Sequence, residues 1–387
     1  MASSFISIKG GVVTIGSVGS DVFAFDLEAR PLFASIGGKT YRRGLMNTYL
    51  HVGNQGGRHF ARRISQEEAE PLIPMIRDRA FELLEKAHPD VDSNINYFMS
   101  RLSRLNWASL KENSQRLMSI YGGRISIIPP DVYFPLYVRY SYGCTWNRCT
   151  FCSLYSGIRH RELSEAEVEK QLSGVMRILG KGTESRRSIF LGDGNAANTS
   201  IENLEPVMRK IRDMLPLPVD SFMDIFTTSP SREEFLLLHD LGLRRIYIGL
   251  ESASTDVLRI LNKPLQLKEA ADIITAAKNS GLAVGLIILS GAGGAKLAKV
   301  HIEKTSEYVA HLPLGHNDIV FISPLELSPG DRYSRIAQIE GLEDLPHEQK
   351  IMQAEILKKE IASRWSSLHG TKIEFPIAPY YLAESIY

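Results

Sequence analysis

The stretch VYFPLYVRYSYGCTWNRCTFC, from Val132 to Cys152, carries the strongest structural signal in the sequence. From Val132 to Tyr142 the side chains alternate with a period of two, which is typical of a β-strand. The strand runs into a loop that holds all three cysteines of the chain: Cys144, Cys149 and Cys152. We therefore expect a loop with reactive thiols at the end of the first strand of a sheet.

Strand-like and helix-like segments alternate downstream of this loop. Ser164 and Glu167 form a capping-box pattern that starts a first crossover helix, and Gly182 ends it. Five further strand-like segments follow, with helical segments between them, over residues 188–191, 221–226, 245–250, 283–289 and 318–325. This rhythm is typical of parallel βαβ units. It predicts an α/β fold, a partial (β/α)₆ TIM-like barrel over residues 131–335, with the active site at the C-terminal ends of its strands.

The flanking segments differ in kind from the barrel. Residues 1–130 predict an α+β accessory region, with short antiparallel strands over residues 5–43 and helices over residues 65–88 and 93–121. Residues 336–387 predict a C-terminal helix over residues 347–365 and an aromatic tail over residues 372–387.

Composition excludes several classes of protein. The chain of 387 residues is 44% hydrophobic and 23% charged with a net charge of +1, which describes a globular protein without a global basic field. The longest apolar run, residues 283–289, is too short to span a bilayer, and the first residues do not form a signal peptide. We expect a soluble cytoplasmic protein with no membrane partner; nucleic acid is disfavoured as a partner but not excluded.

The spacing of the cysteines indicates chemistry rather than a disulfide framework. Three thiolates on one loop can ligate three irons of a four-iron cluster and leave the fourth iron without a protein ligand. The amino and carboxylate groups of a methionine moiety can chelate that open iron, where one electron breaks a carbon–sulfur bond. The alternatives are buried apolar cysteines, or a zinc site with His160 as the fourth ligand.

The segment from Tyr142 to Cys152 resembles the cluster loop of the radical S-adenosylmethionine superfamily. Its C-x₄-C-x₂-C spacing departs from the common C-x₃-C-x₂-C pattern and resembles a subgroup related to anaerobic coproporphyrinogen oxidase type enzymes. The runs 245–252 and 256–263 resemble the fourth strand and following helix of that subgroup. The resemblance implies two cofactors, a [4Fe–4S] cluster on the three cysteines and S-adenosyl-L-methionine, and an external one-electron reductant of the flavodoxin or ferredoxin type.

The resemblance also implies the residues that contact S-adenosylmethionine. Phe151 matches an aromatic residue beside the adenine, and Gly192-Asp193-Gly194 matches a turn whose acidic residue holds the methionine amino group. As an alternative, this tripeptide is an ordinary turn between a strand and a helix.

Two further strand ends complete the predicted cofactor site. Glu251 at the end of the fourth strand can accept the ribose hydroxyls, or it is a solvent-facing helix cap; Ser252 beside it contacts the cofactor or only caps the helix. The glycine-rich segment from Gly291 to Gly294 lets the backbone approach the cofactor, and Ser290 can donate a hydrogen bond to it. A lid hinge is the competing interpretation of this segment.

The reaction class follows partly from what the sequence lacks. There is no fourth cysteine for a second cluster and no Asp-x-His-x-x-Gly cobalamin motif in the first 130 residues. We expect hydrogen abstraction by a 5′-deoxyadenosyl radical from a small or medium organic substrate, followed by rearrangement, elimination, oxidation or carbon–carbon bond formation. The alternatives are a radical enzyme that modifies RNA or a peptide, and a non-catalytic iron–sulfur or zinc protein. A group of N-terminal arginines could bind anionic substrate groups or form a solvated basic face: Arg42, Arg43, Arg58, Arg62 and Arg63.

Overall fold

The computed structural model describes residues 4–19, 21–55, 58–87, 93–132, 134–227, 230–327, 331–382 and 386–387. It separates into two compact units. The N-terminal unit comprises Met1–Leu136, Glu169–Ser188 and Leu382–Tyr387, and the barrel unit comprises Tyr137–Val168 and Ile189–Tyr381.

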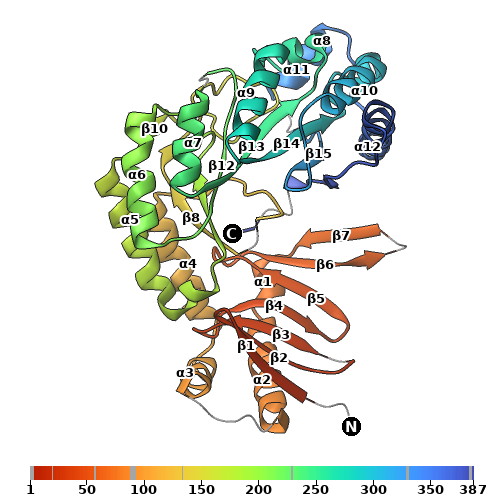
Figure 1. Cartoon of the computed structure of the whole chain (residues 1–387). Helices are drawn as coiled ribbons and strands as arrows, with labels where there is room; N and C mark the ends of the chain where they lie inside the picture. The colour runs from red at the N-terminus through yellow and green to blue at the C-terminus, as the bar shows by residue number, and fades with distance from the viewer. Residues whose placement is uncertain are drawn as a thin grey trace. The chain divides into compact units, whose positions relative to one another are not determined.

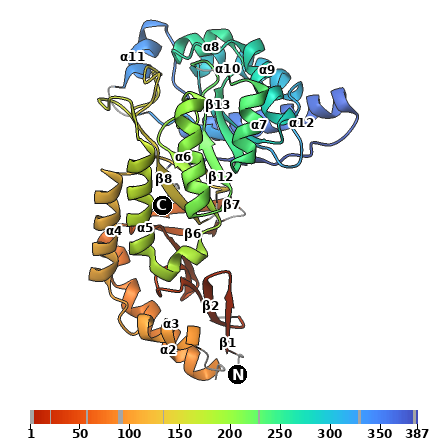
Figure 2. The same ribbon diagram turned by 60° about the vertical axis from the view of Figure 1, so that its left-hand side comes forward.

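The N-terminal unit is built on a seven-stranded antiparallel sheet whose strands follow chain order. Valine, isoleucine and phenylalanine side chains at alternate positions of β2 and β3, such as Val13 and Phe23, are completely buried. Helix α2 packs on β1 and β2 through Ile73, Ile76 and Ala80, and Figure 2 shows α2 and α3 on one face of the sheet. The strands are β1 (Ser4–Lys9), β2 (Val12–Ser17), β3 (Val22–Asp26), β4 (Pro31–Ile36), β5 (Lys39–Arg43), β6 (Tyr49–Gln55) and β7 (Arg58–Arg63).

The expected antiparallel strands are confirmed, and two more, β6 and β7, follow them. Each expected helix divides in two, giving α1 (Gln66–Ala69), α2 (Leu72–Ala87), α3 (Ser93–Leu102) and α4 (Trp107–Tyr121). Pro71 lies between α1 and α2, and a proline cannot supply the backbone N–H that a continuous helix needs. Asn106 starts α4 as its N-cap, because its side chain accepts the Ser109 N–H at 2.9 Å.

The barrel unit is built on a seven-stranded sheet in the order β16-β15-β14-β13-β12-β11-β8, parallel from β11 to β16. Strands β11, β14 and β15 are buried along their whole length, as parallel strands covered on both faces are. The strands are β8 (Pro135–Arg139), β11 (Ser188–Gly192), β12 (Val219–Phe222), β13 (Leu243–Glu251), β14 (Ala283–Ser290), β15 (Ile319–Pro324) and β16 (Ile377–Pro379).

The α/β class and the partial barrel are confirmed, and the sheet is open, with β8 and β16 as its edges. The expectation of six strands misses β16, which comes from the aromatic tail and pairs with β15 through Val320 and Ile377. At three residues β16 is too short to give an alternation signal in the sequence.

Helices cover this sheet between successive strands. Helix α7 packs against β13 and α9 against β14, and α10 and α12 lie side by side (Figure 1). The helices of this unit are α6 (Ile201–Met214), α7 (Arg232–Asp240), α8 (Thr255–Ile260), α9 (Leu267–Asn279), α10 (Gly294–Ala310), α11 (Arg332–Ile339) and α12 (His347–His369). Helix α5 (Glu165–Leu179) begins in this unit, and its residues from Glu169 onward, with a 3₁₀ turn (Gly180–Ser185), belong to the N-terminal unit. Among the described residues, no helix is both long enough and apolar enough to cross a membrane.

Parallel pairing brings the C-terminal ends of the strands to one edge of the sheet. The cysteine loop, defined here as residues 143–160, leaves this edge between two short paired strands, β9 (Ser141–Tyr142) and β10 (Arg161–Glu162). The ends of β11, β12, β13 and β14 lie along the same edge. The fold thus assembles the predicted site from segments that are more than a hundred residues apart in sequence.

Candidate functional site

The cysteine loop has a conformation fixed by the residues that follow α8. Thr150 donates its N–H to the Leu261 carbonyl at 3.0 Å and its hydroxyl to the Ile260 carbonyl at 2.9 Å. Trp146 Nε1 donates to the Asn262 carbonyl, and Asn262 Nδ2 donates to the Arg148 carbonyl, both at 2.9 Å. These bonds hold the loop on both sides of Cys149.

The three cysteines are free thiols, each partly buried. Burial raises the pKa of all three, that of Cys149 to about 12, while the nearby Lys263 ammonium acts in the opposite direction. The pKa of Cys149 is also raised by the charges of Cys144 and Cys152. Three thiols on one loop, none of them in a disulfide, form a donor set that suits an iron–sulfur cluster.

Metal-ligating side chains are not gathered around one point in this structure. In the part of the chain that is described, no three His, Cys, Asp or Glu side chains, the three cysteines included, form a group that could hold a metal ion. His160 is a partly buried residue at the end of the cysteine loop, just before β10.

Glu251 and Lys263 form a buried ion pair beside the thiols. Glu251 ends β13 at a β-bulge with φ +60°, and its Oε1 lies 2.8 Å from Lys263 Nζ. Only 8% of each side chain is exposed. Gly249 makes room for the pair, since a Cβ there would overlap Glu251 Oε1. Although burial lowers the pKa of Lys263, the charges of Glu251 and Cys149 outweigh it and raise this pKa, so the ammonium stays charged.

Lys263 had no role in the sequence-based prediction, which quoted it only within a resemblance. The β-bulge that turns Glu251 toward Lys263 is a feature of the backbone, and no side-chain pattern in the sequence predicts it. A lysine twelve residues after a strand-end glutamate is too common a pattern to reveal the pair.

The Gly192-Asp193-Gly194 segment follows β11 and packs against the start of the cysteine loop. Asp193 is buried and accepts the Tyr137 hydroxyl at 3.1 Å, and Arg139 Nη2 lies 3.4 Å from its other oxygen. A Cβ on Gly194 would lie 2.5 Å from the Gly143 carbonyl oxygen, so only glycine fits there. This glycine therefore brings the β11 end into direct contact with the cysteine loop.

Asp224 belongs to the site and sequence reasoning missed it. Its carboxylate accepts the Thr145 hydroxyl at 3.3 Å and Asn198 Nδ2 at 3.0 Å, and it contacts Asn195 Nδ2. The carboxylate thus joins the end of β12 to the cysteine loop. The expected third strand, over residues 221–226, was wrong about its end, since β12 stops at Phe222 and leaves Asp224 in the loop.

The remaining predicted residues are engaged by protein partners. The buried Ser252 hydroxyl bonds His301 Nδ1 at 2.8 Å and accepts the Ser254 N–H at 3.0 Å. Ser290 donates to the Ser323 carbonyl at 3.4 Å, and the Gly291 N–H donates to Gln353 Oε1 at 2.5 Å.

Phe151 is partly buried against an apolar cluster at the ends of β14 and β15, whose members include Leu261, Leu289, Leu325 and Tyr333. The structure therefore brings the thiols, Phe151, Glu251 and the Gly192–Gly194 segment to one edge of the sheet. Ser252, Ser290 and Gly291 lie at that edge as well, with their polar groups directed to neighbouring residues.

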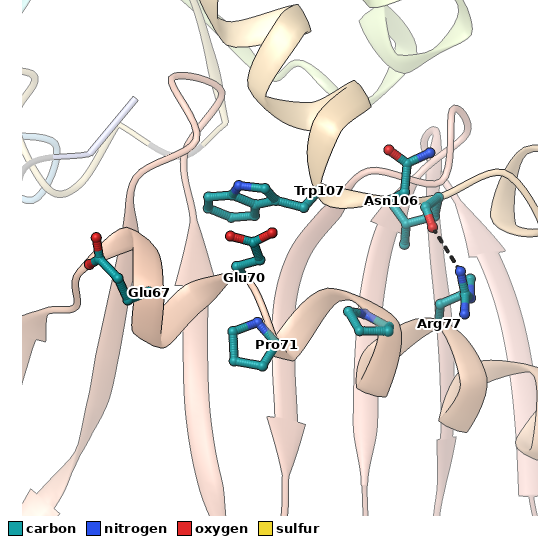
Figure 3. A pocket seen from close by; sticks show the side chains of 8 residues that line it. Glu67, Glu70, Pro71, Arg77, Asn106 and Trp107 are labelled. Atoms are coloured by element: carbon teal, nitrogen blue, oxygen red, sulfur yellow. Dashed lines mark hydrogen bonds between the residues drawn. The ribbon is translucent and has the colours of Figure 1, made fainter.

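Two of the N-terminal arginines are engaged by protein partners. Arg43 is buried and donates to Asn47 Oδ1 at 2.9 Å, and Arg62 pairs with Glu68 at 2.8 Å. The side chain of Arg58 lies outside the described residues. A cavity of about 550 Å³ does occur in this unit (Figure 3). It contains none of the predicted site residues, and it is lined by Glu67, Glu70, Pro71, Pro74, Arg77, Leu105, Asn106 and Trp107.

One family model and several known proteins match parts of this chain. The family model of the radical SAM superfamily matches residues 138–297. A curated relative is the mitochondrial radical S-adenosyl methionine domain-containing protein 1 of Bos taurus, 26% identical over 168 residues. The match covers 41% of this chain and 36% of that protein, so the chain spans about a third of its relative's length.

Solved structures with a similar fold include methylornithine synthase, at 16% identity and a TM-score of 0.42, covering 69% of this chain and 78% of that one. Coproporphyrinogen III oxidase from Escherichia coli matches at 15% identity and a TM-score of 0.44, covering 66% of this chain and 56% of that one. A maturase of the [FeFe]-hydrogenase matches at 15% identity and a TM-score of 0.40, covering 81% and 69%.

Proposed function

Because residues 138–297 match the family model of the radical S-adenosylmethionine superfamily, we propose that the protein is an enzyme that cleaves S-adenosylmethionine reductively and abstracts hydrogen from an organic substrate. The observation that carries the proposal is the arrangement at the strand ends. Three free thiols lie on one loop, and a buried carboxylate–ammonium pair acts electrostatically on one of them, Cys149. The pattern suits a cluster on the thiols and a polar cofactor next to it.

Each residue has a defined task in this proposal. Cys144, Cys149 and Cys152 hold three irons of a [4Fe–4S] cluster, and the Lys263 ammonium offsets part of the negative charge that the thiolates bring into a buried site. When bound, the cluster and S-adenosylmethionine together supply a 5′-deoxyadenosyl radical for hydrogen abstraction.

The polar residues orient the cofactor. Glu251, paired with Lys263, accepts the ribose hydroxyls, and Asp193 holds the methionine amino group. Phe151 packs beside the adenine, and Ser252, Ser290 and Gly291 shape the wall at the ends of β13 and β14. Asp224 fixes the loop at Thr145.

The electron comes from an external reductant of the flavodoxin or ferredoxin type, and the substrate is a small or medium organic molecule. Apolar side chains around the site favour this substrate, because a primary carbon radical must be shielded from solvent and stray hydrogen donors. The reducing cytoplasm suits three free thiols. A peptide or RNA substrate is the alternative, and it requires an open groove at the same strand ends.

Anaerobic reconstitution followed by reduction tests the proposal. We expect about four irons and four sulfides per chain and formation of 5′-deoxyadenosine from S-adenosylmethionine. Cys149→Ala should abolish both, because it removes one of three ligands from a buried site. Zinc in place of iron, or deoxyadenosine at the same rate from Cys149→Ala, would overturn the proposal.

A further inference from the structure

Tyr333 joins two separate parts of the proposed site. It lies near the start of α11 and is 1% exposed. Its backbone N–H donates to the Thr150 carbonyl at 3.0 Å, inside the cysteine loop. Its hydroxyl accepts the Gly293 N–H at 2.9 Å, in the glycine-rich segment after β14. One residue thus bonds the loop of the thiols and the end of a different strand.

The two partners are adjacent to groups with proposed tasks. Thr150 lies between Cys149 and Phe151, and Gly293 lies two residues after Gly291. Phe151 packs against the same apolar cluster to which Tyr333 belongs. The position of the Tyr333 ring therefore sets the separation between Phe151 and the glycine-rich segment.

The glycine-rich segment is fixed by hydrogen bonds to residues that follow it in the chain. The Gly291 N–H bonds Gln353 of α12 at 2.5 Å, and the Ala295 N–H bonds the Glu343 carbonyl at 2.9 Å. A Cβ on Gly294 would overlap that same carbonyl oxygen. The residues from α11 to α12 thus bond this segment at three backbone N–H groups, with Gly293 as the middle one.

We propose that Tyr333 is a positioning residue that fixes the glycine-rich segment against the cysteine loop, so that both contact the adenosine part of S-adenosylmethionine. The inference rests on the proposed function for its cofactor, whereas the coupling itself rests on the two hydrogen bonds of Tyr333. Without the hydroxyl, the buried Gly293 N–H has lost its acceptor, and the segment must move to satisfy it.

Tyr333→Phe is the test, because it keeps the ring and the backbone bond to Thr150 and removes only the acceptor. Tyr308→Phe is the matched control, since Tyr308 is a partly buried tyrosine of α10 whose hydroxyl donates to the Leu267 carbonyl at 2.7 Å. In reconstituted protein we expect Tyr333→Phe to bind iron like the wild type. Calorimetry should show its Kd for S-adenosylmethionine raised about tenfold, and its KM for that cofactor should rise more than kcat falls, whereas Tyr308→Phe leaves both unchanged.

Hydrogen exchange in the metal-free protein gives a second readout that needs no activity. The Gly293 amide should be protected in the wild type and in Tyr308→Phe, and should exchange at least tenfold faster in Tyr333→Phe. An unprotected Gly293 amide in the wild type, or equal cofactor affinity in the two variants, would overturn the inference. Failure of the wild type to bind a cluster would instead sink the proposed function, and the exchange result would still decide the coupling.

Discussion

Glu251 illustrates how much a single residue can be understood from sequence. Its place at the end of a barrel strand predicted a carboxylate at the active edge, and the structure adds Lys263 as its partner. Glu251 reaches this partner because of a β-bulge between Gly249 and Glu251, and no residue pattern in the sequence predicts that bulge. The cysteine site could be predicted without knowledge of the backbone, because the three cysteines lie within nine residues of one another in the sequence.

Replacing Glu251 separates its proposed role from simple packing. Glu251→Gln keeps the size of the side chain and removes the charge that strengthens a hydrogen bond to the ribose hydroxyls. We expect S-adenosylmethionine binding to weaken by about 1–3 kcal/mol, measured anaerobically by calorimetry. Unchanged affinity would assign Glu251 to a structural role only.

The ion pair itself makes a separate prediction about stability. Lys263→Met leaves the buried Glu251 carboxylate without its partner, and we expect a loss of about 3–5 kcal/mol in the free energy of unfolding in urea. The double variant with Glu251→Gln should recover part of that loss, because no uncompensated charge remains. Additive losses in the double variant would mean that the two side chains do not interact.

At the scale of elements, the ends of the strands were the hardest feature to predict from the sequence, although the candidate site residues lie there. The glycines at positions 192 and 194 marked the end of β11 correctly, because close approach to other backbone demands glycine. The end of β12 was placed four residues too late, since Asp224-Ile-Phe continues an extended pattern in the sequence. Contacts between elements far apart, such as Ser252 of the β13 end with His301 of α10, have no local signal at all.

The contact between the β13 end and α10 predicts a pH dependence. Burial lowers the pKa of His301 to about 4, well below its value near 6.5 in an unfolded chain. Between these values the unfolded state binds the extra proton, so stability is fully present above about pH 6.5 and falls as the pH drops toward 4. Wild type should lose about 1 kcal/mol more than His301→Gln between pH 7 and pH 5.5 in urea unfolding. An equal loss in the two proteins would show that His301 is protonated in the folded state.

The seventh strand makes a prediction for the tail. Tyr380, directly after β16, is 2% exposed, and its ring lies 5.5 Å from that of Phe321 in β15. Tyr380→Ala should cost about 3–5 kcal/mol of unfolding free energy, because it leaves a cavity between the tail and the sheet. The exposed Leu368→Ala on α12 serves as the control and should cost far less. Equal, small losses would show that the tail does not pack on β15 in solution.

At the scale of the whole molecule, the alternation of strands and helices in the sequence predicted the fold of the barrel unit. The sequence did not predict a role for the N-terminal unit. Its sheet and helices are explained by alternation and caps, yet no motif there carries chemistry. The residues proposed to hold the cofactors, among them the three cysteines, Glu251 and Lys263, lie in the barrel unit. The central claim is therefore that this unit holds a cluster with one iron open to S-adenosylmethionine.

Electron paramagnetic resonance of the reconstituted, reduced protein tests that claim most directly. A reduced [4Fe–4S] cluster gives a signal whose shape depends on the ligands of each iron, so an open iron must respond when S-adenosylmethionine binds. We predict a four-iron signal that changes shape on addition of S-adenosylmethionine and is absent from Cys149→Ala. A signal that stays unchanged on addition, or no four-iron signal in the wild type, would contradict the account.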